Sequence, residues 1–501
     1  MRREFDRDGR AQARARQVTT KRNPAARTVL RVLQVLTIGG LVAARGAALA
    51  DTSAATLEQL KVQMQQMQEQ MLRMQRRIDE LETEKKSAAV AAPVSAPAPV
   101  PAAAAPPAAV AVAPPTNTAA SLLSGQPVTL MRSASGANYM NLSFDVLTNL
   151  GTSTESDVQE LQLGDHDPDQ RGFSLRNAEL VLDGAVDPYF KGFASVVFKL
   201  DDGNETSLEL EEAYLVTTSL PWNFQLKGGQ FFAEFGRQNQ AHPHAWAFVD
   251  EPLIMARLLG GDGLRNLGAR LSWLAPTPFY TELLLAVFNG EGETAFSFRN
   301  SENTYGRTPL DHGIHTIGDV LWVPRLTSSF DLTDTQTVVI GASGAFGPNN
   351  TGVDGYTRIY GADLYWKWRP ESAQRGFPFV SWQSEAMLRQ YRAEADPTVP
   401  LTRESFDDYG FYSQLLWGFH LRWVAGLRGE YVTGDASEFD AIDPLERGNR
   451  TRISPNLTFY PTEFSKLRLQ YNYDHGQEFG DEHSVWLQAE FILGAHGAHK
   501  F

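Results

Sequence analysis

The amino-acid sequence predicts an all-β protein, a transmembrane antiparallel β-barrel of about 16 strands preceded by an α-helical coiled coil. One observation is a C-terminal segment in which every second residue is apolar or small: Val485, Leu487, Ala489, Phe491, Leu493, Ala495 and Gly497. Successive side chains of a strand point to opposite faces, so this segment has one apolar and one polar face. A strand that ends the chain on an aromatic residue, here Phe501, is typical of outer-membrane barrels.

A second observation is that the same alternation recurs from residue 126 onward. The clearest segments are residues 140–146, 360–368, 422–431 and 466–473. Some connections are short and turn-like, namely 187–188, 219–221, 275–278 and 460–462. Others are long, acidic and polar, namely 149–171, 289–312, 392–408 and 433–449. Short turns at one end and long loops at the other are typical of a transmembrane barrel.

The length of this region sets the number of strands. At roughly 23 residues for each strand with its connection, residues 126–501 accommodate about 16 strands, which would enclose a water-filled lumen. A plugged transporter of about 22 strands would need a longer chain. We expect aromatic girdles at the membrane interfaces from seven tryptophans: Trp222, Trp246, Trp273, Trp366, Trp368, Trp382 and Trp423.

The third observation is a heptad repeat within residues 51–87. Apolar residues alternate at spacings of three and four: Leu57, Leu60, Met64, Met67, Met71, Met74, Ile78 and Leu81. This narrow stripe predicts a coiled coil and self-association, and the four methionines specify the number of chains weakly. A lone amphipathic helix that docks on its own protein is the alternative. Residues 88–125 are almost entirely Ala, Pro and Val and predict a semi-rigid linker.

Residues 1–50 are predicted to be a secretory signal peptide. A basic stretch precedes an apolar core, Val32 to Ala44, and Ala48-Leu49-Ala50 offers a cleavage site before Asp51. The apolar core is too short for a membrane anchor. We therefore expect an exported protein that resides in the bacterial outer membrane, with its coiled coil in the periplasm.

Charge and composition exclude several classes of function. The formal net charge is −14, although residues 1–50 alone carry 11 Lys and Arg against three acidic residues, so the remainder is strongly acidic. An acidic protein is not expected to bind nucleic acid, which requires a basic face. The chain has no cysteine, which excludes disulfides, thiolate metal sites and a cysteine nucleophile. No catalytic motif is found, so we expect no enzyme activity and no cofactor.

Several short motifs resemble those of the phosphate-selective porin O and P family. They are Leu226-Lys227-Gly228-Gly229-Gln230-Phe231 with Phe235-Gly236, Leu267-Gly268-Ala269-Arg270-Leu271-Ser272, Val287-Phe288-Asn289-Gly290 and Gly361-Ala362-Asp363-Leu364, with Phe501 at the end. The resemblance covers roughly residues 135–501 and implies a porin with a constriction segment at 237–266. It also implies a trimer, since some members of that family are trimers that carry an N-terminal coiled coil.

The charges of the barrel region argue against phosphate selectivity. Residues 126–501 contain 28 Lys and Arg but 49 Asp and Glu. A negative field favours cations or neutral solutes, although much of the acid lies in the predicted loops. We expect passive diffusion of small hydrophilic solutes or ions through a homotrimer that contacts outer-membrane lipid and lipopolysaccharide. The alternatives are a structural tether, with the barrel as the anchor of the coiled coil, and a metal-linked uptake porin.

Candidate pore-lining residues come from two sources. The constriction segment contributes Arg237, His242, His244, Asp250, Glu251, Arg257, Asp262 and Arg265. The strands contribute inward-facing charges, which are Arg270, Asp363, Lys367, Glu385, Arg389, Arg422, Arg428, Glu430, Lys466, Arg468 and Glu490. Opposing acids and bases would create a transverse field that orients polar solutes. Alternatively, these charges only solvate the wall and cross-link the strands.

Histidines raise the question of a metal site. His242 and His244, with Asp250 and Glu251 nearby, are ligand types that bind first-row divalent metals. Without further ligands at a fixed spacing, a polar constriction lining is the favoured interpretation and no metal is predicted. His496 and His499 lie three residues apart on a predicted strand, so they face opposite sides and cannot share an ion.

Overall fold

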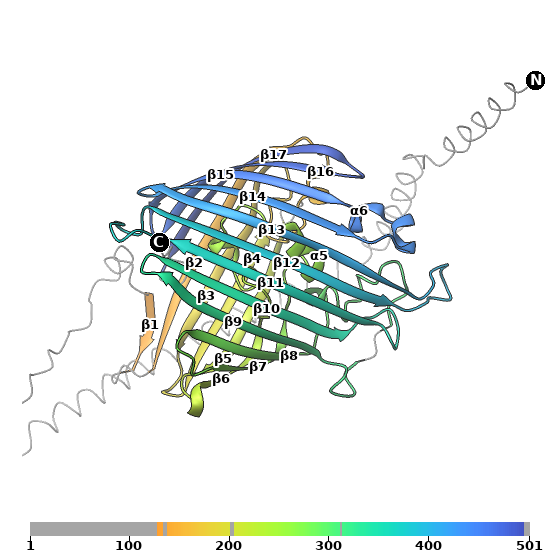
Figure 1. The fold of residues 1–501 in the computed structure, drawn as a ribbon, viewed down its shortest axis with the longest axis horizontal. Helices are drawn as coiled ribbons and strands as arrows, with labels where there is room; N and C mark the ends of the chain where they lie inside the picture. Colours follow the sequence, from red (N-terminus) through yellow and green to blue (C-terminus); the bar gives the residue numbers. More distant parts are fainter. Residues whose placement is uncertain (1–127, 134–137, 201–204, 311–312, 495–501) are drawn as a thin grey trace, which may run out of the picture. The chain divides into compact units, whose positions relative to one another are not determined.

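The protein is a closed antiparallel barrel of 16 strands, β2 to β17, in which each strand pairs with the next (Figure 1). The computed structural model describes residues 128–133, 138–200, 205–310 and 313–494. The pairing of β17 with β2 closes the barrel. The predicted all-β antiparallel barrel and its strand number are therefore confirmed. The predicted signal peptide, coiled coil and linker all lie outside the described residues.

The barrel strands are long and follow one another without a crossover. Their bounds are β2 (Tyr139–Ser153), β3 (Gly172–Ala185), β4 (Phe190–Leu200), β5 (Thr206–Thr217), β6 (Phe224–Phe232), β7 (Arg265–Leu274), β8 (Tyr280–Phe288), β9 (Leu321–Thr333), β10 (Gln336–Pro348), β11 (Tyr356–Trp368), β12 (Phe379–Ala393), β13 (Glu404–His420), β14 (Trp423–Gly434), β15 (Arg450–Thr462), β16 (Ser465–Gly476) and β17 (Gly480–Leu493). The described helices are short: α4 (Val158–Leu161), η1 (Pro221–Asn223), η2 (Pro243–Ala245), α5 (Leu253–Leu259), η3 (Glu293–Ala295), η4 (Glu438–Ala441) and α6 (Pro444–Arg447). No helix among the described residues is long and apolar enough to cross a membrane.

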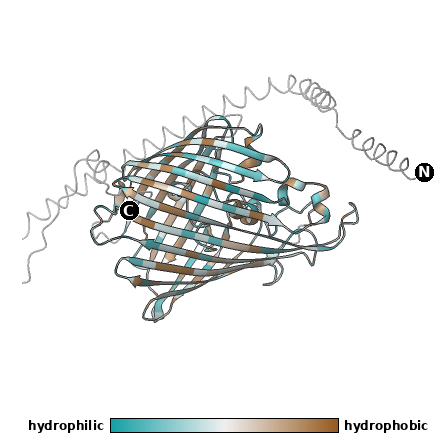
Figure 2. Cartoon of the chain, turned by 45° about the horizontal axis from the view of Figure 1, so that its top comes forward, coloured by the Kyte–Doolittle hydropathy of each residue, from teal (hydrophilic) through white to brown (hydrophobic). Residues whose placement is uncertain are grey.

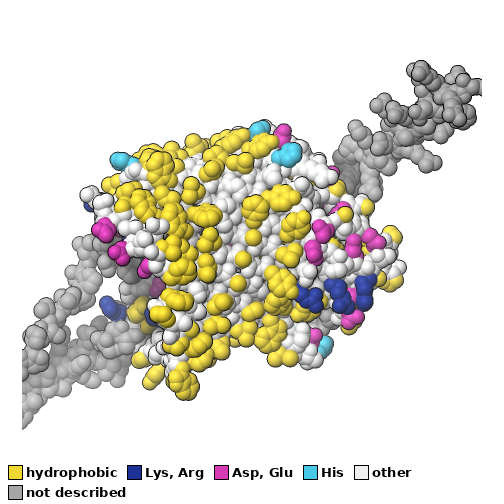
Figure 3. Space-filling view, viewed as in Figure 1, with side chains coloured by type: hydrophobic (Ala, Val, Ile, Leu, Met, Phe, Trp, Pro, Cys, Tyr) yellow, Lys and Arg dark blue, Asp and Glu magenta, His cyan; other side chains and the backbone are white. Residues whose placement is uncertain are grey.

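The two faces of the wall follow the predicted alternation. In β17, Leu487 and Phe491 point outward and are exposed, whereas Gln488 and Glu490 point inward and are buried. The same division runs along the other strands, which alternate in hydropathy (Figure 2). The outer surface therefore presents a broad band of apolar side chains (Figure 3). A barrel of this kind places its apolar band against lipid and keeps its polar groups inside.

The seam of the barrel joins the last strand to the first of its 16 strands, and a short additional strand extends it. Residues Ser484–Leu493 of β17 pair with Phe144–Ser153 of β2. A further short strand, β1 (Val128–Arg132), pairs with Tyr139–Leu142 on β2. β1 thus continues along the edge of β2 where the pairing with β17 stops.

The connections differ at the two ends of the barrel, as predicted, although two of the predicted loops are shorter. Short turns join β3 to β4, β7 to β8 and β9 to β10 at one end, and long connections gather at the other (Figure 1). Residues 149–153 and 404–408, predicted to be loop, belong to β2 and β13, because polar residues there face the lumen. Arg422, predicted to face inward, lies in an exposed turn between β13 and β14.

The interior of the barrel is largely filled by residues 233–264, which connect β6 to β7 and fold inward around α5. All seven residues of α5 are buried, and Met255 and Leu258 pack against wall residues such as Ile359 and Met387. Trp246, predicted to lie in an interfacial girdle, is buried in this segment, where its Nε1–H donates to the carbonyl of Ala241. A helix that is apolar on all sides requires burial, so the lumen contains a dry core beside its polar regions.

A substitution at Leu469 tests whether the apolar outer surface faces lipid. The side chain of Leu469 is 52% exposed, and the residue pairs with Leu457 on one side and Leu487 on the other. We expect Leu469→Arg to lower the free energy of unfolding by about 2–4 kcal/mol, because a charge would face hydrocarbon. Urea unfolding in lipid vesicles measures the change, with Leu469→Phe as the apolar control. Equal stability of the two variants would contradict a lipid-facing position.

Candidate pore constriction

The infolded segment 233–264 is held in the lumen by a buried carboxylate. Both oxygens of Asp250, which is 1% exposed, face the opposite wall. Arg428 on β14 and Arg452 on β15 form ion pairs with Asp250. Gln470 and Asn472 on β16 donate amide hydrogens to it over 2.8 and 2.6 Å. Burial alone would raise the pKa of Asp250, but the two guanidinium groups outweigh burial and lower it.

Other predicted site residues hold the backbone of the same segment. Glu385 accepts the backbone N–H groups of Arg237 and Gln238, and Glu430 accepts that of Leu253 over 2.7 Å. On the other side Lys466 donates to the carbonyl of His244, and Arg468 donates to those of Trp246 and Phe248 (2.7, 2.9 and 2.9 Å). These wall charges satisfy backbone groups that would otherwise be buried without partners. They therefore position the segment.

The remaining predicted residues form local pairs. Arg389 pairs with Asp408, Arg265 with Glu209 and Asp363 with Arg325, while Arg257 donates to the carbonyl of Gly448. Lys466 also pairs with Glu490. Glu251 is buried, and its backbone N–H donates to Asp167 over 2.8 Å. These contacts match the cross-linking alternative, while a role in lining a conducting path stays a prediction for each.

A large cavity lies on the short-turn side of the segment. Its volume is about 780 Å³, and residues near the short turns, such as Lys367 and Tyr460, line it together with residues of the segment. Its charged side chains are mostly basic: Arg237, Arg270, Arg325 and Lys367, against Glu234 and Glu282. Arg270 pairs with Glu234 over 2.9 Å. Arg237 lies over the ring of Tyr365, 4.0 Å from its centre.

A second cavity of about 470 Å³ lies among the long connections. Its charged side chains are mostly acidic: Asp165, Asp169, Asp262, Glu293 and Glu302, against Arg176. The two cavities therefore carry fixed charges of opposite sign. The infolded segment contributes to the lining of both, with residues 234–247 at the first and 260–262 at the second.

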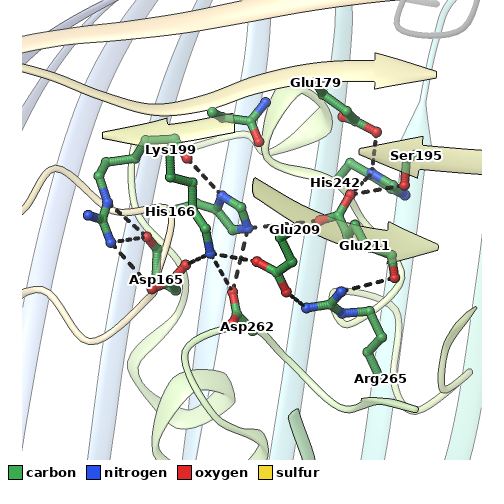
Figure 4. A network of polar contacts seen from close by, with 12 residues as sticks. Asp165, His166, Glu179, Ser195, Lys199, Glu209, Glu211, His242, Asp262 and Arg265 are labelled. Carbon is green, nitrogen blue, oxygen red and sulfur yellow. Dashed lines mark hydrogen bonds and ion pairs between the residues drawn. The ribbon is translucent and has the colours of Figure 1, made fainter. Parts of the chain in front are cut away.

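A network of imidazoles and carboxylates lies between the two cavities (Figure 4). His244 lines the larger cavity, and its Nδ1 lies 3.1 Å from Glu179. The Nδ1 of His242 lies 2.9 Å from Glu179 and 3.0 Å from Glu211. Glu211 in turn faces His166 over 3.8 Å. The Nε2 of His166 is 3.7 Å from Asp262, which lines the second cavity.

The structure groups His242 and His244 with acids that the sequence analysis did not select. Asp250 and Glu251, which adjoin His242 and His244 in sequence, contact other partners. Two sets of side chains are instead close enough to share an ion: Glu179 with His242 and His244, and Asp165 with His166 and Asp262. In the second set the ammonium of Lys199 already pairs with both acids. Two features of the sequence could have indicated these acids. They are the polar inward positions of β3 and β5 and the sequence Asp165-His166-Asp167.

The surroundings of His166 favour the neutral imidazole. Burial, followed by the positive charge of Lys199, lowers its pKa. Its Nδ1 lies 3.0 Å from the carbonyl oxygen of Arg176. A carbonyl can only accept, so Nδ1 carries the hydrogen and Nε2 has a lone pair. That lone pair faces the carboxylates of Glu211 and Asp262.

Comparison with known proteins identifies a relative for the chain. An uncharacterized protein of Aquifex aeolicus (strain VF5) is 32% identical over 376 residues, which are 69% of this chain and 76% of the relative. The chain belongs to the family of this Aquifex protein. No family model matches the sequence, so the resemblance to the phosphate-selective porins stays a prediction.

Solved structures share the fold of this chain. The outer membrane channel DcaP of Acinetobacter baumannii superposes with a TM-score of 0.50 at 13% identity, over 72% of this chain and 99% of that chain. At such low identity the likeness shows a porin-like barrel fold alone. An anion-selective porin from Comamonas acidovorans has a TM-score of 0.46 at 8% identity, over 71% of this chain and all of its own, and adds nothing to that conclusion.

Asp250 provides a test of how the segment is held. Asp250→Ala removes one of the two carboxylates that pair with Arg428 and with Arg452, while Glu430 and Asp474 remain. It also takes away the acceptor of the buried amides of Gln470 and Asn472, so we expect a cost of about 1–3 kcal/mol. We expect the segment to leave the wall and expose Arg257, which is 7% exposed in the native structure, to trypsin. Mass spectrometry of the fragments detects this cleavage. Asp334→Ala, in the exposed turn between β9 and β10, is the control. Equal resistance of both variants would show that Asp250 does not hold the segment.

Proposed function

We propose that the protein is an outer-membrane porin through which small hydrophilic solutes or ions diffuse passively. The observation that carries this proposal is the pair of polar cavities, one on each side of an infolded segment, inside a closed barrel with an apolar outer wall. Polar side chains along a lumen replace part of the hydration shell of a solute, and a narrow segment sieves by size. The apolar outer wall supports a position in lipid.

The charges of the two cavities support weak selectivity for sign. The larger cavity is mostly basic and the second cavity mostly acidic, so a solute of either sign meets one attractive and one repulsive region. Arg237 and Lys367 are the cations of the larger cavity for which no acidic partner occurs among the described residues. This arrangement does not favour phosphate over other small ions.

Assembly and placement are part of the proposal. The heptads of residues 57–81 support self-association, with a homotrimer as the expected state, and a periplasmic coiled coil. The long connections would then meet lipopolysaccharide outside the cell. A structural tether remains the alternative function. Step-like current through purified protein in a planar bilayer would support the porin function. A barrel that never conducts would support the tether function instead.

Selectivity for sign can be measured from the reversal potential in a KCl gradient. We expect Arg237→Gln and Lys367→Gln each to shift the permeability ratio toward cations. A unit charge about 4 Å from a passing ion in water contributes about 1 kcal/mol, so the shift should be up to about fivefold.

Lys191→Gln is the matched control for these two variants. It removes a positive charge from an exposed position at the short-turn end of β4, outside both cavities. An unchanged reversal potential in both lumen variants would show that ions do not pass through the larger cavity.

A further inference from the structure

Four carboxylates are buried together in the wall beside His242 and His244. They are Asp145, Glu179, Glu211 and Glu212, each 6% exposed or less. Among the described residues, the charged groups that pair with them are histidines, and no Lys or Arg side chain does so. Buried carboxylates are costly unless a cation or several hydrogen bonds compensate them. This cluster therefore has an excess of negative charge.

The geometry at His242 is that of a metal ligand. Oxygens of Glu179 and Glu211 converge on its Nδ1 over 2.9 and 3.0 Å. One nitrogen carries at most one hydrogen, so it cannot donate fully to both. Ligand atoms around a tetrahedral zinc ion, each at 2.0–2.2 Å, are about 3.3 Å apart. The two distances from Nδ1 are thus close to the spacing of ligands that share one ion. Glu179, His242 and His244 all lie close enough to one another to share it, and Glu211 approaches it through its contact with His242.

The other nitrogen of His242 supports the same assignment. Its Nε2 lies 3.1 Å from Glu212, which also accepts the backbone N–H of Phe232 over 3.1 Å. A histidine that binds a metal usually donates its second N–H to a carboxylate, which fixes the tautomer and the ring orientation. Glu212 is therefore placed as the orienting residue, and Nδ1 is left to face the two other carboxylates.

Two more groups point toward the same place. The Nδ1 of His244 lies 3.1 Å from Glu179, and the two imidazole rings are 5.6 Å apart between centres. Oε1 of Glu211 is buried and takes part in no hydrogen bond. It lies 3.8 Å from Nε2 of His166.

We propose that a first-row divalent metal ion, of the zinc or cobalt type, binds at Glu179, Glu211, His242 and His244. Two imidazoles and two carboxylates form a set that suits these ions. The ion offsets the negative charge of the cluster, and Glu212 orients His242.

The position of the site gives it a role in the channel. The network joins His244, which lines the larger cavity, to Asp262, which lines the second cavity. Figure 4 shows the part from His242 to Asp262. A bound ion adds positive charge to the buried network between residues that line the two cavities, so it opposes the passage of other cations. This role, unlike the binding itself, rests on the proposed porin function.

Binding is tested on the full-length protein, purified in detergent and stripped of metal with a chelator. Titration calorimetry with zinc chloride should give one ion per chain. Cobalt chloride should give the visible absorption bands of four-coordinate cobalt. His242→Ala and Glu211→Gln should abolish both signals, and Glu212→Gln should weaken zinc binding by about 10–100-fold. His475→Ala, an exposed histidine paired with Asp481, is the control that should change nothing.

Conductance of the same samples in KCl separates this proposal from the porin function. Zinc should lower the current of the native protein, a chelator should restore it, and Glu211→Gln should conduct without responding to zinc. If the protein conducts but zinc and cobalt do not bind, the metal site is wrong and the cluster is an imidazolium–carboxylate network. If the metals bind but no current flows, the porin function is wrong while the site stands. Glu211→Gln keeps the test valid if His242→Ala does not fold.

Discussion

The pairing of β17 with β2 is the interaction on which the rest of the structure depends. In a lipid environment every backbone N–H and C=O must find a partner within the protein, and only a closed sheet leaves no open edge. In a closed barrel the number of strands sets the width of the lumen. With 16 strands the interior is wider than wall side chains alone can fill, and residues 233–264 occupy much of it. The charged residues inside the barrel are arranged around this infolded segment.

The lumen combines two kinds of interior. On one side α5 packs its apolar residues against wall residues such as Ile359 and Met387. On the other, Asp250 and its arginine partners form buried ion pairs. Removing one member of such a pair leaves an uncompensated charge, so the polar side tolerates change poorly. The dry core and the ion pairs together occupy lumen volume between the two cavities described above.

The strands could be predicted from the sequence because a period of two is local and repeats. The inward position of Glu490 follows from that period alone. The contacts of the infolded segment could not be predicted, because residues 233–264 have no regular period that orients their side chains. The helix from Leu253 to Leu259 is apolar on nearly every side, so its sequence does not show which side packs against the wall. Trp246 was misassigned for the same reason, since its type is common both at interfaces and in interiors.

The short strand β1 bears on the order in which the barrel assembles. Its partners on β2 lie only a few residues further along the chain, whereas β17 must find β2 from some 340 residues away. Chain entropy makes the distant closure about 3 kcal/mol harder than the local one. Local pairs of this type form first, so β1 and β2 make a hairpin while the rest of the chain is still unpaired. The edge that receives the last strand is then already shortened, and the register in which that strand can dock is limited before it arrives.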